Sequence, residues 1–237
     1  MDLKETDILG DDIARHWYYR SKAAATMRLL RSHAPSVILD VGAGSGFFSR
    51  YLLAHTSAAE AWCVDISYSV DSEAEEQGKP LHFRRSLDTV HADTLLLMDV
   101  LEHVDDDVGL LAGYAACAPS GARFVISVPA FQFLWSGHDV FLDHKRRYTL
   151  KQLEKLVRLS GLTPVHSTYY FGLVFPLAVI SRLSKRLRLW DDGVATSQLK
   201  RHSSLTNAVL AAVCRAELAL LAFNRVAGLT AFCVAVK

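Results

Sequence analysis

Short apolar runs alternate with helical segments through the first half of the chain, and this alternation predicts the fold. The apolar runs are residues 37–41, 61–64, 81–85, 94–98 and 122–128. Short runs that are apolar at nearly every position are typical of strands buried on both faces of a parallel sheet. Helical spacing between them, at residues 47–54 and 105–117, predicts an α/β fold with helices on both faces of the sheet.

The second half adds two predicted strands. Residues 163–170 and 229–236 carry strand patterns, which brings the expected Rossmann-like, mostly parallel sheet to seven strands. Residues 149–160 form an amphipathic helix that begins at a threonine cap and ends before a glycine. Residues 71–79 are acidic and polar, which predicts a solvated helix or loop.

The length of 237 residues fits one large α/β domain, so we predict a single domain over residues 1–237. Its expected parts are an N-terminal helical lid (1–35, with a helix at 11–31), a cofactor-binding core (36–130), a substrate loop (131–148) and a helical insertion between the last two strands (172–227). The insertion is expected to hold two helices and a polar linker, at residues 173–190, 203–226 and 191–202.

A glycine-rich turn follows the first predicted strand. Residues 40–46 read Asp-Val-Gly-Ala-Gly-Ser-Gly, and a predicted helix begins at the next residue. Glycines in such a turn let a ligand lie against the backbone, at the crevice where doubly wound folds bind nucleotide-like ligands. Asp65 ends the next strand, where its carboxylate can bind ribose hydroxyls. A dinucleotide site would instead show the spacing Gly-x-Gly-x-x-Gly.

The order Asp-x-Gly-x-Gly-x-Gly resembles the first motif of class I S-adenosylmethionine-dependent methyltransferases. Residues 99–104, Asp-Val-Leu-Glu-His-Val, resemble the fourth motif of small-molecule enzymes of the ubiquinone-biosynthesis type, bacterial methyltransferases of types 11 and 12. The resemblance implies S-adenosylmethionine as cofactor and S-adenosylhomocysteine as product. The cofactor-binding residues that we expect from it are Tyr18, Arg20, Asp40, Gly42, Ala43, Gly44, Gly46, Asp65, Ile66, Leu87, Asp99 and Val100.

An aromatic cluster lies in the N-terminal helix, at residues 16–20. Many methyltransferases of this type carry a similar His-Trp-aromatic-Arg cluster that closes over the cofactor, which makes Tyr18 and Arg20 candidates for polar contacts there. The alternative is an amphipathic helix that packs its aromatic rings on the sheet.

The segment after the fifth strand is the most unusual in the chain, because histidines, aspartates and consecutive bases interleave with aromatic residues over residues 129–148. It resembles a His-Asp…His-x-Arg-Arg-Tyr segment of bacterial methyltransferases linked to glycan and lipid pathways. We expect catalytic roles for His138, His144 and Tyr148. Substrate contacts are expected from His103, Trp135, Arg146 and Arg147. The alternatives are a loop whose charges satisfy one another and, for His103, a structural role.

We expect no metal in this segment. Asp139, Asp143 and His144 offer ligand atoms but lack a characteristic spacing.

Charge and motifs argue against a nucleic-acid substrate. The chain has 26 basic and 25 acidic residues, a net charge of +1, so no overall field would attract nucleic acid. The Asn/Asp-Pro-Pro-aromatic motif of DNA amino-methylating enzymes is also absent after the fourth strand. Four distant cysteines in apolar surroundings predict buried, reduced thiols. The first residues do not resemble a signal peptide, so a cytoplasmic location is expected.

Residues 173–190 predict a basic amphipathic helix, with an apolar stripe opposite Arg182, Lys185, Arg186 and Arg188. One interpretation is peripheral binding to an anionic membrane surface on the inner face, and the other is a lid helix with a solvated basic face.

The predicted function is methyl transfer from S-adenosylmethionine to a small-molecule or lipid/glycan-linked acceptor, most simply on oxygen. Two alternatives remain, a non-catalytic cofactor-binding partner subunit and a dinucleotide-dependent oxidoreductase. The glycine order and the Asp-Val-Leu-Glu-His-Val segment disfavour the oxidoreductase. The oligomeric state and the identity of the acceptor are left open by the sequence.

Overall fold

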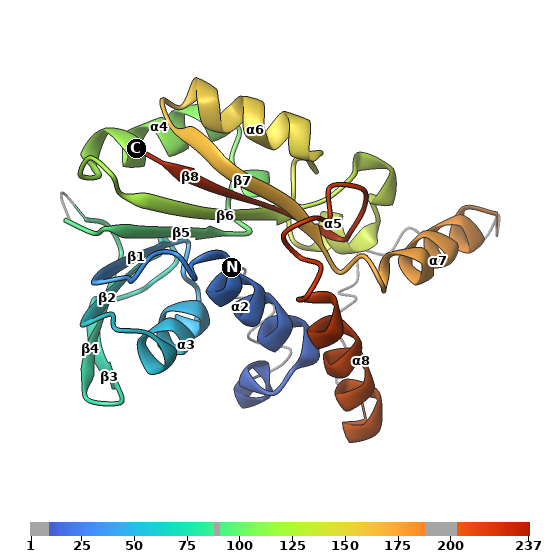
Figure 1. The fold of residues 1–237 in the computed structure, drawn as a ribbon, viewed down its shortest axis with the longest axis horizontal. Helices are drawn as coiled ribbons and strands as arrows, with labels where there is room; N and C mark the ends of the chain where they lie inside the picture. Colours follow the sequence, from blue (N-terminus) through green and yellow to red (C-terminus); the bar gives the residue numbers. More distant parts are fainter. Residues whose placement is uncertain (1–9, 88–90, 188–202) are drawn as a thin grey trace.

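The computed structural model describes residues 10–87, 91–187 and 203–237. Its centre is one sheet of eight strands in the order β3-β4-β2-β1-β5-β6-β8-β7 (Figure 1). β3 and β8 run antiparallel to their neighbours, and the remaining pairs are parallel. The strands are β1 (Val37–Val41), β2 (Glu60–Val64), β3 (Ser72–Glu76), β4 (Lys79–Arg84), β5 (Thr94–Met98), β6 (Arg123–Pro129), β7 (Thr163–Tyr170) and β8 (Thr230–Val236). The Rossmann-like α/β prediction is confirmed.

The eighth strand is a correction, because residues 71–79 were expected to form a solvated helix or loop. Instead β3 pairs with β4 at the sheet edge through a turn at Gln77 and Gly78, which have φ of 52° and 78°. Positive φ at both central residues is the geometry of a two-residue hairpin turn. The strand is rich in glutamate because it lies on the exposed edge, where charge discourages pairing with another chain.

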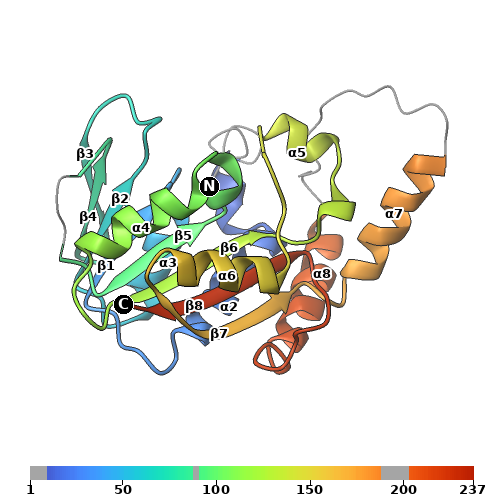
Figure 2. The ribbon, with the colours of Figure 1, turned by 90° about the horizontal axis from the view of Figure 1, so that it is seen from above.

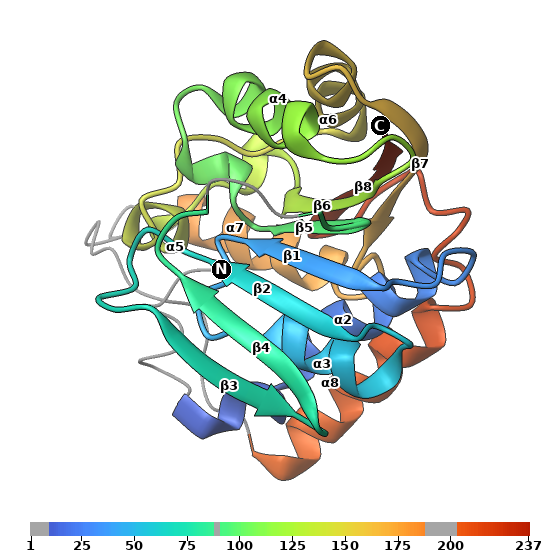
Figure 3. The same ribbon diagram turned by 90° about the vertical axis from the view of Figure 1, so that its left-hand side faces the viewer.

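Helices cover both faces of the sheet (Figures 1 and 3). α4 (Asp107–Cys117) and α6 (Leu150–Leu159) lie on one face. α2 (Trp17–Leu29), α3 (Phe47–His55) and α8 (Ser204–Glu217) lie on the other. Each set of helices packs against the sheet through an apolar layer. β5 lies at the centre of the sheet between the two layers and is buried at every position. α7 (Phe175–Leu187) extends beyond the end of the sheet (Figure 2).

Some predicted boundaries were wrong. The expected helix at residues 11–31 is split, because His16 is extended (φ −68°, ψ 130°) between η1 (Gly10–Ala14) and α2. The last helix was expected to continue to residue 226 but ends at Glu217, whose carboxylate accepts hydrogen bonds from the backbone N–H groups of Gly172 and Leu173. Cys117 is exposed, not buried.

Two expectations for the insertion reach beyond the described part of the chain. The polar linker at 191–202 and the end of the predicted helix at 188–190 lie outside the described residues. Within the described residues, no helix has the length and apolarity to cross a membrane.

The topology places all the predicted motifs at one edge of the sheet. The glycine turn follows β1, Asp65 follows β2, Asp99 follows β5 and the loop at 131–148 follows β6. Because these four strands are parallel, their carboxyl ends meet at the same edge. The order also reverses between β1 and β5, and such a switch point is where open α/β sheets bind ligands.

Candidate active site

The glycine turn is shaped so that side chains are excluded from it. Gly42, Gly44 and Gly46 have φ of 64°, 55° and 72°, in the left-handed region that favours glycine. A Cβ on Gly42 would lie 2.7 Å from Cγ2 of Val100, and a Cβ on Gly46 would lie 3.0 Å from the ring of Phe83. The N–H groups of these glycines donate hydrogen bonds to the carbonyl of Val64, the carboxylate of Asp65 and the carbonyl of Ala43, so the turn is fixed from within.

Two acids flank this turn. The Asp65 carboxylate is fixed by hydrogen bonds from the backbone N–H groups of Gly44 and Ser67, each 3.0 Å long. Asp40 is buried and accepts a 2.8 Å hydrogen bond from the Ser49 hydroxyl. Burial raises the pKa of Asp40 to about 6, against the effect of that hydrogen bond. A carboxylate at the end of β2 is thus preset beside the turn for a hydroxyl-bearing ligand.

The other expected cofactor residues lie around these acids. Ala43 is buried in the apolar layer on one face of the sheet, and Val100 and Leu87 pack against the layer on the other face. Ile66 is 83% exposed, so its side chain stands free beside Asp65.

The N-terminal helix brings a cation to Asp99, and this cation is Lys22. Arg20 is exposed, whereas Lys22, two residues on, is fully buried and forms an ion pair with Asp99. The Lys22 ammonium also lies 3.4 Å from the Tyr18 hydroxyl. Burial disfavours its charge, but the Asp99 carboxylate more than compensates and raises the pKa of Lys22 above its usual value. Nothing in the spacing of the helix distinguished Lys22 from an ordinary solvated lysine.

A cavity of about 400 Å³ opens beside this ion pair. Its wall mixes apolar side chains with two acids, Asp99 and Glu102, and with histidines and arginines. Its lining residues are Trp17, Tyr18, Asp99, Glu102, His103, Pro129, Leu134, His138, Leu142, His144, Arg147, Leu177, Ala178, Ser181, Arg182, Leu229 and Thr230. The glycine turn and Asp65 are not among them.

Three histidines gather in this cavity. His103 comes from η2 (Leu101–His103), His138 from α5 (Gly137–Phe141), and His144 from the segment that follows α5. The ring centroids of His103 and His144 lie 4.8 Å apart, and those of His138 and His144 lie 6.5 Å apart. Burial lowers the pKa of His138 to about 4, so its imidazole is neutral at neutral pH.

Asp139 organises two of the groups in the loop. Its carboxylate lies 3.0 Å from Nδ1 of His144 and 2.6 Å from Nε of Arg147. Burial opposes the Asp139 charge, but the hydrogen bonds from His144 and Arg147 hold its pKa well below the usual range. The two groups that face the cavity are therefore held in place by a buried carboxylate, which is how oriented catalytic groups are commonly supported.

Three other predicted residues do not line the cavity. The Tyr148 hydroxyl lies 2.7 Å from Asp107 and 3.1 Å from the carbonyl of Leu101, so it ties the loop to α4. Arg146 lies 3.2 Å from the same Asp107 carboxylate. Trp135 is half-buried outside the lining. In the structure Tyr148 and Arg146 both brace the loop against Asp107, and the catalytic and substrate roles expected of them stay predictions.

Two cavity residues were missed as site residues by the sequence analysis. Arg182 was placed on a solvated basic face, yet it lines the cavity and donates a 3.1 Å hydrogen bond from Nε to the carbonyl of Leu134. Glu102 is fully buried, and neither of its carboxylate oxygens has a hydrogen-bond partner among the described residues. Burial and then the nearby Asp99 charge raise the pKa of Glu102 well above its usual value.

Backbone strain gathers at the same edge. Asp99, Phe131 and Asp143 have φ of 56°, 59° and 57°, values that residues other than glycine seldom adopt. Such strain persists where the surrounding structure imposes it, and it is concentrated at functional sites.

Comparison with known proteins agrees with this geometry. Residues 14–167 match the family model described as a methyltransferase domain. No sequence among the curated proteins matches the chain.

Solved structures share the fold at low identity. A protein described as a methyltransferase, solved with the Haloferax volcanii activator Trm112, has a TM-score of 0.59 and 16% identity over 99% of this chain and 92% of that one. A protein of Galdieria sulphuraria described as a sarcosine dimethylglycine methyltransferase has a TM-score of 0.53 and 14% identity, over 92% of this chain and 85% of its own. Phosphoethanolamine N-methyltransferase 2 of Haemonchus contortus, in complex with S-adenosylmethionine, has a TM-score of 0.53 and 13% identity, over 90% of this chain and 52% of its own. At these identities the likeness shows the fold alone.

The Lys22–Asp99 pair predicts a stability difference between two cations of the same helix. Lys22→Met should lower the free energy of unfolding by about 3–5 kcal/mol, because it leaves the Asp99 charge unpaired beside the buried Glu102. Arg20→Met, the matched control, should change it by less than about 0.5 kcal/mol, since Arg20 is exposed. Urea denaturation of both variants measures the difference, and equal stabilities would contradict the assignment.

Proposed function

Because the chain belongs to the methyltransferase-domain family and its cofactor is S-adenosylmethionine, we propose that it methylates an oxygen of a small-molecule or lipid-linked acceptor. The observation that carries this proposal is the cavity beside Asp99, where three histidines and two arginines face apolar walls. A neutral imidazole suits the removal of a proton from a hydroxyl, and the apolar walls suit a largely hydrophobic acceptor.

The residues around the glycine turn fit the cofactor. Asp65 would accept hydrogen bonds from the ribose hydroxyls, and the glycines of the turn would let the methionine part lie against the backbone. Tyr18 and Asp99 line the cavity and would face the cofactor from it. When bound, the cofactor supplies an electrophilic methyl group with a neutral thioether as leaving group. The protein's share of the work is then to align the acceptor and to exclude water.

His138 is the proposed general base. It is half-buried in the cavity wall and neutral at neutral pH, so a ring nitrogen can accept the proton that the acceptor hydroxyl loses. His144, held by Asp139, would position the acceptor beside it. Arg147 and Arg182 place two cations on the same wall, which suits an acceptor that also carries an anionic group.

A lipid-linked acceptor is supported by the helix over the cavity mouth. Leu177 and Ala178 of α7 line the cavity, and the same helix leaves Leu177, Ile180 and Leu183 more than half exposed. Exposed apolar side chains on one helix suit contact with lipid, so we propose a cytoplasmic protein that works at the inner face of the membrane.

The competing account is a cofactor-binding subunit without activity of its own. Both accounts predict cofactor binding, but only an enzyme releases S-adenosylhomocysteine when it is given cofactor and an extract that contains the acceptor. Absence of release from the folded, cofactor-bound protein would favour the subunit.

The first test concerns the cofactor. Asp65→Asn should weaken S-adenosylmethionine binding by about 1.5–3 kcal/mol, the range of hydrogen bonds to a charged group. Asp71→Asn is the matched control, because Asp71 is an exposed acid on the segment that follows the same strand. Calorimetry measures both affinities, and a wild-type affinity in folded Asp65→Asn would contradict the role given to Asp65.

The second test separates binding from turnover. His138→Ala should retain S-adenosylmethionine affinity and lose about 10²–10⁴ in rate, the usual range for a positioned acid or base. Val140→Ala changes an exposed residue of the same short helix and should keep the wild-type rate. A His138→Ala variant with a raised KM for the acceptor and an intact kcat would instead assign His138 to acceptor binding.

The third test concerns the membrane. The protein should co-sediment with anionic vesicles at low salt and less so as salt rises, because salt screens the basic residues of α7. The double variant Ile180→Ser/Leu183→Ser should lose this binding. Leu205→Ser/Val209→Ser, on the exposed side of α8, should keep it. If the wild-type protein stays in the supernatant, α7 is a lid and not a membrane contact.

A further inference from the structure

Glu102 is the feature of the site that the proposed methyl transfer does not use. Its side chain is fully buried, it lines the cavity, and both carboxylate oxygens lack a hydrogen-bond partner among the described residues. Leaving a buried polar group without a partner costs several kcal/mol, so native proteins seldom do so without a function. Lys22, the nearby cation, is already paired with Asp99.

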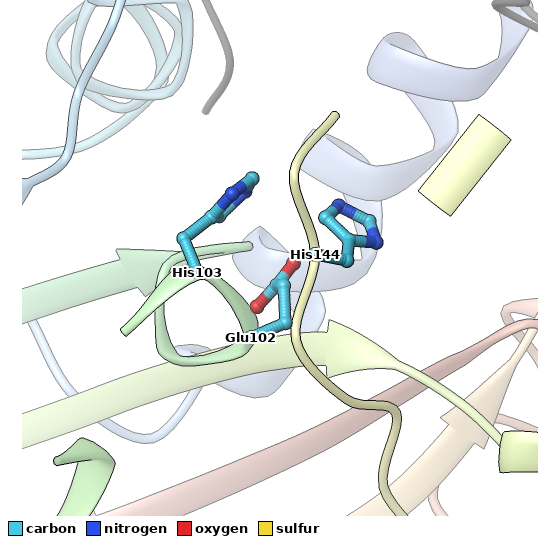
Figure 4. A group of neighbouring side chains, drawn as sticks. All are labelled: Glu102, His103 and His144. Atoms are coloured by element: carbon cyan, nitrogen blue, oxygen red, sulfur yellow. The ribbon is translucent and has the colours of Figure 1, made fainter. Parts of the chain in front are cut away.

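Two imidazoles complete a cluster around this carboxylate. Glu102 and His103 come from η2, and His144 comes from the neighbouring segment after α5 (Figure 4). One ligand atom from each of the three residues lies within 4.8 Å of the other two. Ligand bonds of about 2.1 Å hold neighbouring ligand atoms roughly 3–3.5 Å apart. Side-chain rotations that move these atoms by about an ångström would therefore let all three bind one ion.

The surroundings of His144 match those of a metal ligand. Its Nδ1 lies 3.0 Å from the Asp139 carboxylate, which Arg147 holds from another side. A carboxylate at one ring nitrogen sets the tautomer and orients the other nitrogen, Nε2, as the ligand atom. The ring is also nearly perpendicular to that of His103, at 81°.

We propose that Glu102, His103 and His144 bind one divalent transition-metal ion, and that this ion holds the acceptor oxygen in the cavity. Two imidazoles and one carboxylate are a donor set for Zn²⁺, Mn²⁺ or Fe²⁺, and three protein ligands leave a coordination position open. All three residues line the cavity, so the open position faces the acceptor. No metal was expected from the sequence, because Asp139, Asp143 and His144 lack a characteristic spacing; the ligand set proposed here shares only His144 with that group.

The second half of the inference rests on the proposed function. A hydroxyl bound to the ion is more acidic than a free one. Its O–H bond breaks with the proton passing to His138, an O–C bond forms to the methyl group, and the C–S bond breaks with its electron pair left on sulfur. The step consumes no oxidant or reductant.

Metal binding is tested on the tag-free full chain after treatment with a chelator. Calorimetry with Zn²⁺, and separately with Mn²⁺, should give one site per chain. Glu102→Gln and His144→Ala should each weaken binding by at least about 100-fold, because each removes a ligand. Glu75→Gln and His55→Ala, which change exposed residues, should bind like the wild type.

Thermal melts serve as the control that each variant is folded. Zn²⁺ should raise the Tm of the wild-type protein and of the control variants but not that of Glu102→Gln, since a ligand stabilises only the state that binds it. Glu102→Gln keeps the shape of the side chain and removes its charge, so this variant should remain folded. Absence of a one-to-one site in the wild type, or wild-type affinity in both ligand variants, would overturn the proposal.

The same samples separate this inference from the proposed function. S-adenosylmethionine affinity and S-adenosylhomocysteine release are measured beside metal affinity. Metal binding without methyl transfer would support the metal site and contradict the proposed reaction. If the protein binds no metal and still transfers methyl groups after chelation, the proposed reaction is supported and the metal site is contradicted.

Discussion

The buried ion pair between Lys22 and Asp99 is the contact on which the arrangement of the site depends. It joins α2, near the start of the described chain, to the carboxyl end of β5 in the middle of the sheet. The Lys22 ammonium is fully buried and needs a partner, and Asp99 supplies it from the cavity wall, so this contact fixes where α2 crosses the sheet edge. Trp17 and Tyr18 line the cavity as a consequence. The turn at Asp99, which has a positive φ, leads to Glu102 and His103 in the same lining.

A second polar network closes the cavity from the opposite side. The backbone N–H of Lys145 donates a 2.7 Å hydrogen bond to the carbonyl of Glu102, which holds the segment after α5 against η2. Beside the end of β6, the backbone N–H of Phe131 donates to the carbonyl of Tyr148, and the N–H of Tyr148 donates to the carbonyl of Pro129. The Asp139 carboxylate holds the side chains of His144 and Arg147. The loop that connects β6 to α6 is therefore an ordered wall, built before any acceptor arrives, and such preorganisation lowers the cost of binding.

Local pattern was sufficient where burial alone decides the structure. The strands at Thr94–Met98 and Thr163–Tyr170 lie where their apolar and alternating patterns placed them, and the aspartate and glycines of the first turn meet Asp65 because parallel strands end together. β3 was missed because its glutamates show no apolar face, and only the turn at Gln77 and Gly78 could have revealed it.

The charged groups of the site were harder to predict because their roles depend on partners distant in sequence. Lys22 and Arg20 look alike on a helix, and only packing decides which of them meets Asp99, 77 positions away from Lys22. The hydroxyl of Tyr148 donates to Asp107, 41 positions earlier, a contact that no local pattern shows, and its expected catalytic role stays a prediction. The orphaned carboxylate of Glu102 is likewise visible only in three dimensions.

The central claim is that the histidine-lined cavity receives a hydroxyl-bearing acceptor for the cofactor's methyl group. The most direct measurement supplies the protein with S-adenosylmethionine labelled with ¹³C in its methyl group, together with small-molecule and lipid extracts, and identifies the labelled product by NMR. We expect S-adenosylhomocysteine to be released and the label to appear as a methoxy group on an apolar acceptor. Label on nitrogen or carbon, or no labelled product from protein that binds the cofactor, would contradict the account.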